Sequence, residues 1–229
     1  MAQFNSRESD DIELVLRAAA FAALKHRDQR RKDRRATPYI NHPLAVAQVL
    51  SEEGGVHEPH VLAAALLHDT IEDTETTYQE LCGAFGRPVA DLVAEVTDTK
   101  FLKKNSRKKL QVAKAGHASR AAQQIKIADK LCNLRDILSR PPADWTPLDK
   151  NVYFDWAKSV VDRIRHANPR LVRQFDALYA NERPRGPDSG RSVSGPRYHE
   201  APLDFGQELL RNLKRNVELE AKGKIGPPS

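Results

Sequence analysis

Residues 61–73 read VLAAALLHDTIED, and the sequence changes character in the middle of this stretch. Apolar residues come first, and His68, Asp69, Glu72 and Asp73 follow at once. The apolar run predicts a buried helix that ends in a polar cluster. Because a His and an Asp are costly to bury without a partner, the pair at its end indicates a binding site.

A metal ion would be a suitable partner for both His68 and Asp69. Adjacent side chains on a helix diverge by about 100°, so they reach one ion only where the helix frays or tightens. If the helix continues for another turn, Glu72 and Asp73 each lie four residues after one of the pair. Two such acids suit a site where a carboxylate handles the proton of a water molecule, so both are predicted to be catalytic.

Two more residues complete the predicted metal site. His42 precedes Pro43, and Asp129 follows the apolar residues of a second helical segment. Taken alone, a His before Pro is usually a turn or capping residue, and a lone Asp in a basic helix usually forms an exposed ion pair. Together with His68 and Asp69, they form a mixed nitrogen and oxygen set that Mn(II) or another borderline divalent ion accepts.

The rest of the chain predicts an all-α fold, because apolar residues recur at helical spacing and no segment alternates as a strand does. We expect a bundle of about eight to ten helices with a C-terminal extension. The helices are predicted over residues 10–27, 43–53, 58–69, 77–85, 88–97, 106–115, 119–139, 149–167 and 169–181.

The composition changes at about residue 182. Residues 184–197 contain three Pro, three Gly and three Ser, which is typical of a linker. The predicted organisation is a catalytic domain over 1–181, a linker over 182–202 and an extension over 203–229. Apolar residues in the extension are spaced as in an amphipathic helix, which would dock on this domain, on a second subunit or on another protein.

Composition and charge narrow the class of protein. The 229 residues are 40% hydrophobic and 30% charged, with a formal charge of +6, which favours anionic partners. Cys82 and Cys132 form no CxxC pair, and the polar N-terminus is unlike a secretory signal. The longest apolar runs have seven residues, whereas a membrane helix needs about 20. We therefore expect a cytoplasmic protein with no membrane partner.

The ordered set of His, His-Asp and Asp resembles the signature of the HD-domain phosphohydrolases. Three longer strings are similar to the stand-alone small alarmone hydrolases of the Rel/SpoT type, including the animal SpoT homologue. The strings are RRKDRRATPYINHPLAVA at 30–47, AALLHDTIEDTETT at 64–77 and IKIADKLCNLRDI at 125–137. The resemblance extends from about residue 12 to about residue 180.

The resemblance implies an all-helical HD domain that removes pyrophosphate from the ribose 3′ position of ppGpp or pppGpp, giving GDP or GTP. One divalent ion per site, usually Mn(II), would be bound by the four residues already named. Glu72 and Asp73 match the pair that activates the hydrolytic water. Arg31 and Lys32 match a pair that lines the nucleotide pocket, and Asn133 matches a residue near the ribose.

Cys132 departs from the family, since the animal homologue has an aromatic residue there, and this leaves the fine substrate preference open. Two other functions are also open. The first is an HD-type phosphohydrolase for another nucleotide, such as NADPH at its 2′-phosphate. The second is a non-catalytic module for nucleotides or nucleic acid, although the basic residues lack the interleaved aromatic residues that stack on bases. We expect a small-molecule substrate and no nucleic acid, and a homo-oligomer stays open.

Overall fold

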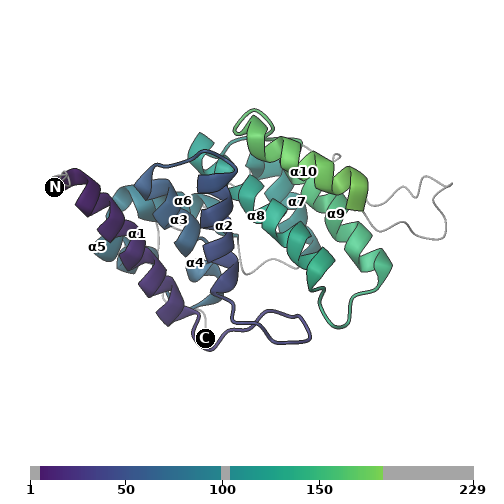
Figure 1. The fold of residues 1–229 in the computed structure, drawn as a ribbon, viewed down its shortest axis with the longest axis horizontal. Helices are drawn as coiled ribbons and strands as arrows, with labels where there is room; N and C mark the ends of the chain where they lie inside the picture. Colours follow the sequence, from purple (N-terminus) through teal and green to yellow (C-terminus); the bar gives the residue numbers. More distant parts are fainter. Residues whose placement is uncertain (1–5, 99–103, 183–229) are drawn as a thin grey trace, which may run out of the picture.

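The computed structural model describes residues 6–98 and 104–182, and the regular structure in these ranges is helical apart from two isolated bridges. The predicted all-α class is therefore confirmed for the described part of the chain (Figure 1). Its helices are α1 Ser6–Lys25, α2 Asn41–Glu52, α3 Pro59–Leu67, α4 Thr70–Asp73, α5 Tyr78–Phe85, α6 Arg87–Val96, α7 Lys104–Ala115, α8 Arg120–Ser139, α9 Pro147–Val161 and α10 Pro169–Glu182.

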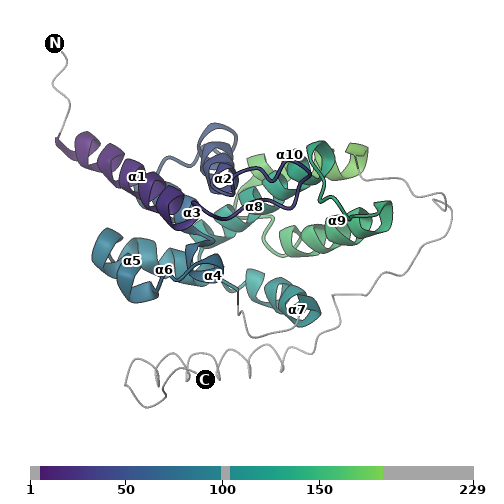
Figure 2. The same ribbon diagram turned by 90° about the horizontal axis from the view of Figure 1, so that it is seen from below.

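Helix α3 lies inside the bundle and contacts α1, α2, α6 and α8 (Figures 1 and 2). Ala63, Ala64 and Ala65 have no exposed surface, and Leu66 and Leu67 beside them are also buried. Alanine side chains let neighbouring helices approach closely, while burial of the leucines supplies much of the hydrophobic free energy. The apolar run that predicted a buried helix is therefore the centre of the core.

Helix α8 is the second long element of the core and contacts α2, α3, α6, α9 and α10. Its apolar residues are buried together with two lysines, Lys126 and Lys130. Buried ammonium groups need polar partners. The Lys126 ammonium donates to the Val96 carbonyl oxygen at 3.0 Å, and Lys130 pairs with Asp129. Asp129 in turn lies 4.0 Å from His68, the residue that directly follows α3.

Three of the differences from the predicted helix boundaries bear on the fold. Helix α1 begins at Ser6 and not at residue 10, because its polar first turn continues the helix in solvent. Helix α3 ends at Leu67, before the His68-Asp69 pair, and α4 is a separate turn. Helix α9 ends at Val161, and turns occupy most of the segment predicted to continue it.

The predicted linker over 182–202 and the extension over 203–229 lie outside the described residues, except for Glu182, which ends α10. Within the described residues, no helix is long and apolar enough to cross a membrane.

Candidate metal centre and substrate pocket

The break between α3 and α4 presents His68 and Asp69 to the same point. The backbone of Asp69 has φ −98° and ψ −2°, which is the geometry of a tight turn. Thr70 donates its hydroxyl to the Leu67 carbonyl oxygen at 2.7 Å, and the Asp73 amide donates to the Asp69 carbonyl oxygen at 2.8 Å. The backbone thus forms a tight turn at the predicted position, and the adjacent side chains of His68 and Asp69 reach the same site.

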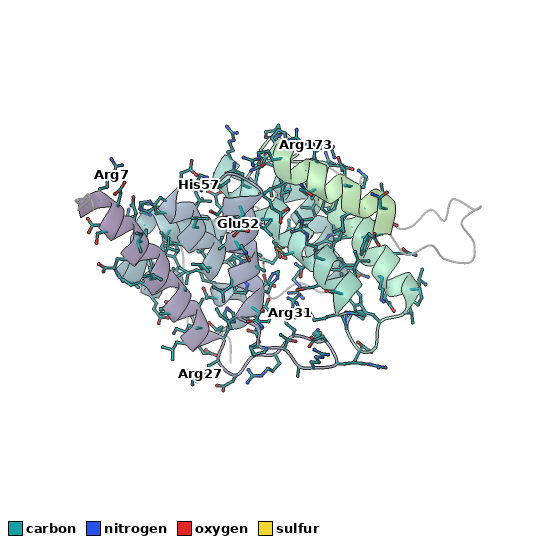
Figure 3. The ribbon with its side chains drawn as sticks, viewed as in Figure 1. Arg7, Arg27, Arg31, Glu52, His57 and Arg173 are labelled. Carbon is teal, nitrogen blue, oxygen red and sulfur yellow. The ribbon has the colours of Figure 1, made fainter. Side chains whose placement is uncertain are left out.

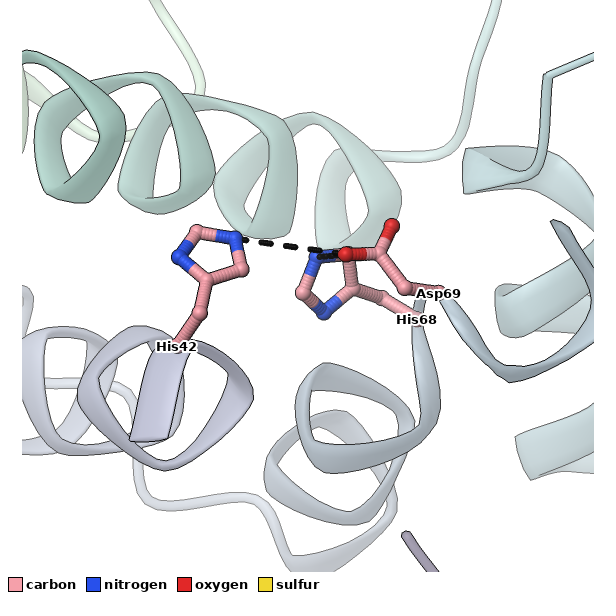
Figure 4. Close-up of side chains that lie close together, drawn as sticks. All are labelled: His42, His68 and Asp69. Atoms are coloured by element: carbon pink, nitrogen blue, oxygen red, sulfur yellow. Dashed lines mark ion pairs between the residues drawn. The ribbon is translucent and has the colours of Figure 1, made fainter. Parts of the chain in front are cut away.

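Four donor atoms from three segments of the chain meet at this point, and Figure 4 shows three of the residues that carry them, His42, His68 and Asp69. The Nε2 atom of His42, on α2, lies 4.0 Å from Asp69 Oδ2 and 3.1 Å from Asp129 Oδ1. The Nε2 atom of His68 lies 3.0 Å from the same Asp69 oxygen and 4.0 Å from the Asp129 oxygen. Two imidazole nitrogens and two carboxylate oxygens therefore alternate around one small space.

The donor set fits a divalent cation. Two ligands about 2.1 Å from one ion lie about 3.0 Å apart at a right angle and about 3.4 Å apart at a tetrahedral angle. The donor atoms of His42, His68 and Asp69 all lie within 4.8 Å of one another. The His68 Nδ1 donates to the Ala65 carbonyl oxygen at 2.8 Å, which directs its Nε2 into the site, 3.0 Å from Asp69 Oδ2.

The charges around these donors hold both carboxylates ionised. Burial works to raise the pKa of Asp129, but Lys130, His42 and His68 hold that pKa well below its usual range. The pKa of Asp69 is lowered in the same way by His68 and His42, against the effect of burial. Burial lowers the pKa of His68, but the two acids outweigh it and raise that pKa to about 9. A cation would take the place of this proton.

A second layer of hydrogen bonds orients the donors. The Tyr39 hydroxyl donates to Asp69 Oδ2 at 2.5 Å. The Lys130 ammonium donates to Asp129 Oδ2 at 2.8 Å, and the Asn133 amide donates to Asp129 Oδ1 at 2.5 Å. Such contacts fix the orientation of ligating groups before a metal binds.

Glu72 lines the same cavity as the four donors. This cavity has a volume of about 360 Å³. It accepts hydrogen bonds from Arg107 of α7 at 3.1 Å and from the Asp98 amide at 3.2 Å. Figure 2 shows α7 beside α4, the turn that carries Glu72. Burial, together with the charges of Asp98 and Asp69, raises the pKa of Glu72 to about 7. A carboxyl group with this pKa is suited to exchange protons near neutral pH.

Asp73 faces a different space, although the sequence paired it with Glu72. It lines an adjoining cavity of about 380 Å³, and its Oδ2 accepts a hydrogen bond from the Gln29 amide at 2.9 Å. The two cavities share the residues of their common wall, which are Lys32, Tyr39, His42, Asn133, Trp145 and Tyr153. The two acids therefore lie on either side of one continuous pocket.

The three predicted substrate residues all line the pocket. Asn133 bridges its two halves, since it donates to Asp129 and accepts a hydrogen bond from Arg31 at 3.1 Å. Arg31 also pairs with Asp136 at 2.7 Å. Figure 3 shows Arg31 on the inner side of its loop, whereas Arg27 lies at the outer end of α1. Lys32 is exposed and borders both cavities.

Several aromatic residues that line the pocket were not predicted from the sequence. Trp145 and Tyr153 line both cavities, and Trp156 lines the one that holds the metal donors. The Lys108 ammonium lies 5.4 Å from the centre of the Tyr153 ring and 4.8 Å from that of Trp156. The spacing of Tyr153 and Trp156, three residues apart on a helix, was the signal that could have found this aromatic cluster.

Cys132 is buried in α8 and lies outside the residues that line the two cavities. Burial raises the pKa of its thiol to about 12. The departure at this position therefore changes packing in the core, away from the pocket wall.

Comparisons with known proteins agree with this arrangement. The chain matches the HD domain family over residues 18–153. It is 49% identical to the Xenopus tropicalis guanosine-3′,5′-bis(diphosphate) 3′-pyrophosphohydrolase MESH1, over 76% of this chain and 97% of the relative. The human MESH1 is 50% identical, over 72% of this chain and 92% of the relative.

The chain belongs to the HD-domain family. A solved structure of a metazoan SpoT orthologue, described as hydrolysing ppGpp, superposes with a TM-score of 0.72 and 42% identity, over 78% of this chain and 97% of that one. The Escherichia coli K12 bifunctional (p)ppGpp synthase/hydrolase SpoT is 38% identical over 75% of this chain but only 25% of its own length. The resemblance inferred from the three motifs, and the HD fold it implied, are confirmed.

Proposed function

We propose that this protein removes pyrophosphate from the ribose 3′ position of ppGpp or pppGpp, leaving GDP or GTP. The observation that carries the proposal is the cluster of two imidazole nitrogens and two carboxylate oxygens with Glu72 in the same cavity. This combination suits a hydrolytic site, because a purely structural metal site does not need an additional acid beside its ligands. The Xenopus tropicalis and human relatives are named as guanosine-3′,5′-bis(diphosphate) 3′-pyrophosphohydrolases, and this is the same reaction.

The pocket matches a guanine nucleotide with two anionic arms. Arg107, Lys126 and Lys130 line the cavity around the metal donors and would attract the 3′-diphosphate. Arg30, Arg31 and Arg140 line the adjoining cavity, where they would meet the remainder of the nucleotide. Trp145 and Tyr153, on the common wall, offer faces on which a purine can stack.

His42, His68, Asp69 and Asp129 would hold one divalent cation, and Mn(II) suits their mixed donor set. When bound, this ion would polarise the phosphoryl oxygens and lower the pKa of an attacking water. Lys130 and Asn133 keep the Asp129 carboxylate in place for this task. Tyr39 does the same for Asp69.

In the proposed reaction, Glu72 accepts a proton as the water oxygen forms a bond to the phosphorus next to the ribose. The bond between that phosphorus and the ribose 3′ oxygen breaks, so pyrophosphate leaves and the 3′ oxygen takes up a proton. Arg107, which pairs with Glu72 at 3.1 Å, would stabilise negative charge that develops on the phosphoryl oxygens. Asp73, across the pocket, would orient the water through its free carboxylate oxygen.

A substrate panel tests this proposal. The full chain with Mn(II) is incubated with equal concentrations of ppGpp, pppGpp, NADPH and a deoxynucleoside triphosphate, and initial rates are compared. We expect the alarmones to be hydrolysed at least about tenfold faster than the others, because only they carry a 3′-diphosphate. Hydrolysis of NADPH or the deoxynucleotide with no action on ppGpp would contradict the proposal.

The domain limits are part of the same proposal. We assign the catalytic unit to residues 1–181, since α10 ends at Glu182 and the described residues that line the pocket all precede it. The cytoplasmic location, the absence of a nucleic-acid partner and the oligomeric state stay predictions.

A further inference from the structure

The loop that follows α1 is tied together by its own backbone. The Gln29 amide donates to the His26 carbonyl oxygen at 3.0 Å, and the Tyr39 amide donates to the Gln29 carbonyl oxygen at 3.1 Å. Three side chains are thereby held in one unit, which lies beside the segment that carries Asp69 and Asp73. The Tyr39 hydroxyl reaches Asp69, and the Gln29 amide group reaches Asp73.

The side chains of His26 and Gln29 form a short chain of hydrogen bonds that ends on Asp73. His26 Nδ1 lies 2.5 Å from Gln29 Oε1, and Gln29 Nε2 lies 2.9 Å from Asp73 Oδ2. A flipped amide would place two acceptors, Gln29 Oε1 and the Asp73 carboxylate, against each other. The carboxylate therefore fixes the amide, and the amide oxygen requires a proton on His26 Nδ1.

The anchor of this chain is a buried imidazole that the proposed chemistry does not use. His26 is only 1% exposed, and its ring packs against the Tyr39 ring with centroids 5.0 Å apart. Its Nε2 is buried and has no hydrogen-bond partner among the described residues. A ring enclosed in this way has few alternative rotamers, so it is a rigid support for a longer and more flexible glutamine.

We propose that His26 and Gln29 are positioning residues that orient the Asp73 carboxylate toward the attacking water. Gln29 donates to Asp73 Oδ2, and this leaves Oδ1 of the pocket-lining acid available to a water molecule. The loop thus contacts two carboxylates of the site. Tyr39 donates to Asp69, and Gln29 donates to Asp73. The expected effect on kcat rests on the proposed function, whereas the expected tautomer of His26 does not.

The kinetic test is Gln29→Leu, which removes the amide and leaves a shorter, apolar side chain. We expect kcat on ppGpp to fall about tenfold, since an amide hydrogen bond to a carboxylate is lost, while KM changes less than about twofold. Mn(II) affinity should stay close to that of the parent. The matched control is Gln48→Leu, which removes a similar amide–carboxylate contact, to Glu52 at 3.1 Å, on the outer face of α2. It should leave kcat unchanged.

A double-mutant cycle separates positioning from a general structural role. If Gln29 acts through Asp73, Gln29→Leu should have almost no further effect on kcat in an Asp73→Asn background. Additive losses, or a rise in KM with unchanged kcat, would overturn the proposal. His26→Asn, whose amide can replace the Nδ1 donor, should retain more activity than His26→Leu.

A substrate-independent measurement keeps the two proposals distinguishable. Nitrogen-15 NMR of the histidine side chains of the full chain should show His26 as the Nδ1–H tautomer, and Gln29→Leu should shift this signal. An Nε2–H tautomer would overturn the positioning role whatever the substrate is. A parent protein that shows the expected tautomer but does not hydrolyse ppGpp would refute the proposed function alone.

Discussion

Glu72 is the residue whose chemistry is most dependent on its surroundings. It lies three residues after Asp69 in sequence, yet it shares the metal cavity only because α3 and α4 are separate. Burial and the neighbouring acids raise its pKa to about 7, while Arg107 keeps it aimed along the cavity wall. An acid so placed can accept a proton from water without itself binding the cation.

Glu72→Gln should therefore retain the metal and lose most of the activity. We expect kcat to fall about a hundredfold or more, because general-base catalysis contributes about 10² to 10⁴. Mn(II) binding, followed by calorimetry, should change little. Glu75→Gln, on an exposed neighbour, is the control and should be fully active. A fully active Glu72→Gln enzyme would show that the base is a different group.

The raised pKa of Glu72 also predicts how stability depends on pH. Its folded-state pKa of about 7 exceeds the ordinary value of 4.5, so the stabilising contribution is present below pH 4.5 and is lost as pH rises through 7. In protein stripped of metal, the parent should lose unfolding free energy between pH 5 and pH 8, whereas Glu72→Gln lacks this titration. The unfolding free energy of Glu72→Gln should therefore rise by about 2 kcal/mol relative to that of the parent over this range. Denaturant unfolding at both pH values measures this change. A constant difference between the two proteins would contradict the assignment.

Asp129→Ala removes a donor from the cluster and takes the carboxylate partner away from the buried Lys130 ammonium. The variant should lose both bound metal and detectable hydrolysis, and its Tm should fall because a buried charge is left unpaired. Metal content by elemental analysis and the rate on ppGpp check the result. Asp144→Ala, at an exposed position, should keep both. A metal-loaded Asp129→Ala protein would remove Asp129 from the ligand set.

At the scale of the elements, the sequence was sufficient to predict a helix or a break wherever apolar periodicity and neighbouring residues determine it. The apolar run before His68 predicted the buried α3, and the polar burst after it predicted a local break. The separation of Glu72 from Asp73 could not be predicted, because it depends on the angle between α3 and α4. Partners such as Gln29, Tyr39 and Arg107 could not be predicted either, since they reach the site from distant segments through tertiary packing.

The N-terminus of α9 offers a test at this scale. Thr146 and Asp149 form a reciprocal capping box directly after Trp145, and Tyr153 lies one turn further on. Thr146→Ala should cost about 1 kcal/mol of unfolding free energy, because the side-chain cap is lost. Thr146→Ser, which keeps the hydroxyl, should cost much less. An unchanged free energy of unfolding in Thr146→Ala would show that the cap does not stabilise α9.

For the whole molecule, the described helices form one core around α3 and α8, and the pocket lies between residues of α2, α4, α7, α8 and α9. Truncation after Glu182 should therefore leave kcat and KM on ppGpp within about twofold of the full chain, because the described residues that line the pocket are all kept. Side-by-side kinetics of the two forms provide the check. A large loss of activity would place part of the site in residues 183–229.

The most direct test of the whole account is product analysis after the full chain is incubated with ppGpp and Mn(II). We expect equal amounts of GDP and pyrophosphate, and no product from Asp129→Ala under the same conditions. Release of single phosphates, cleavage of the 5′ arm, or turnover that persists without the metal ligands would contradict it.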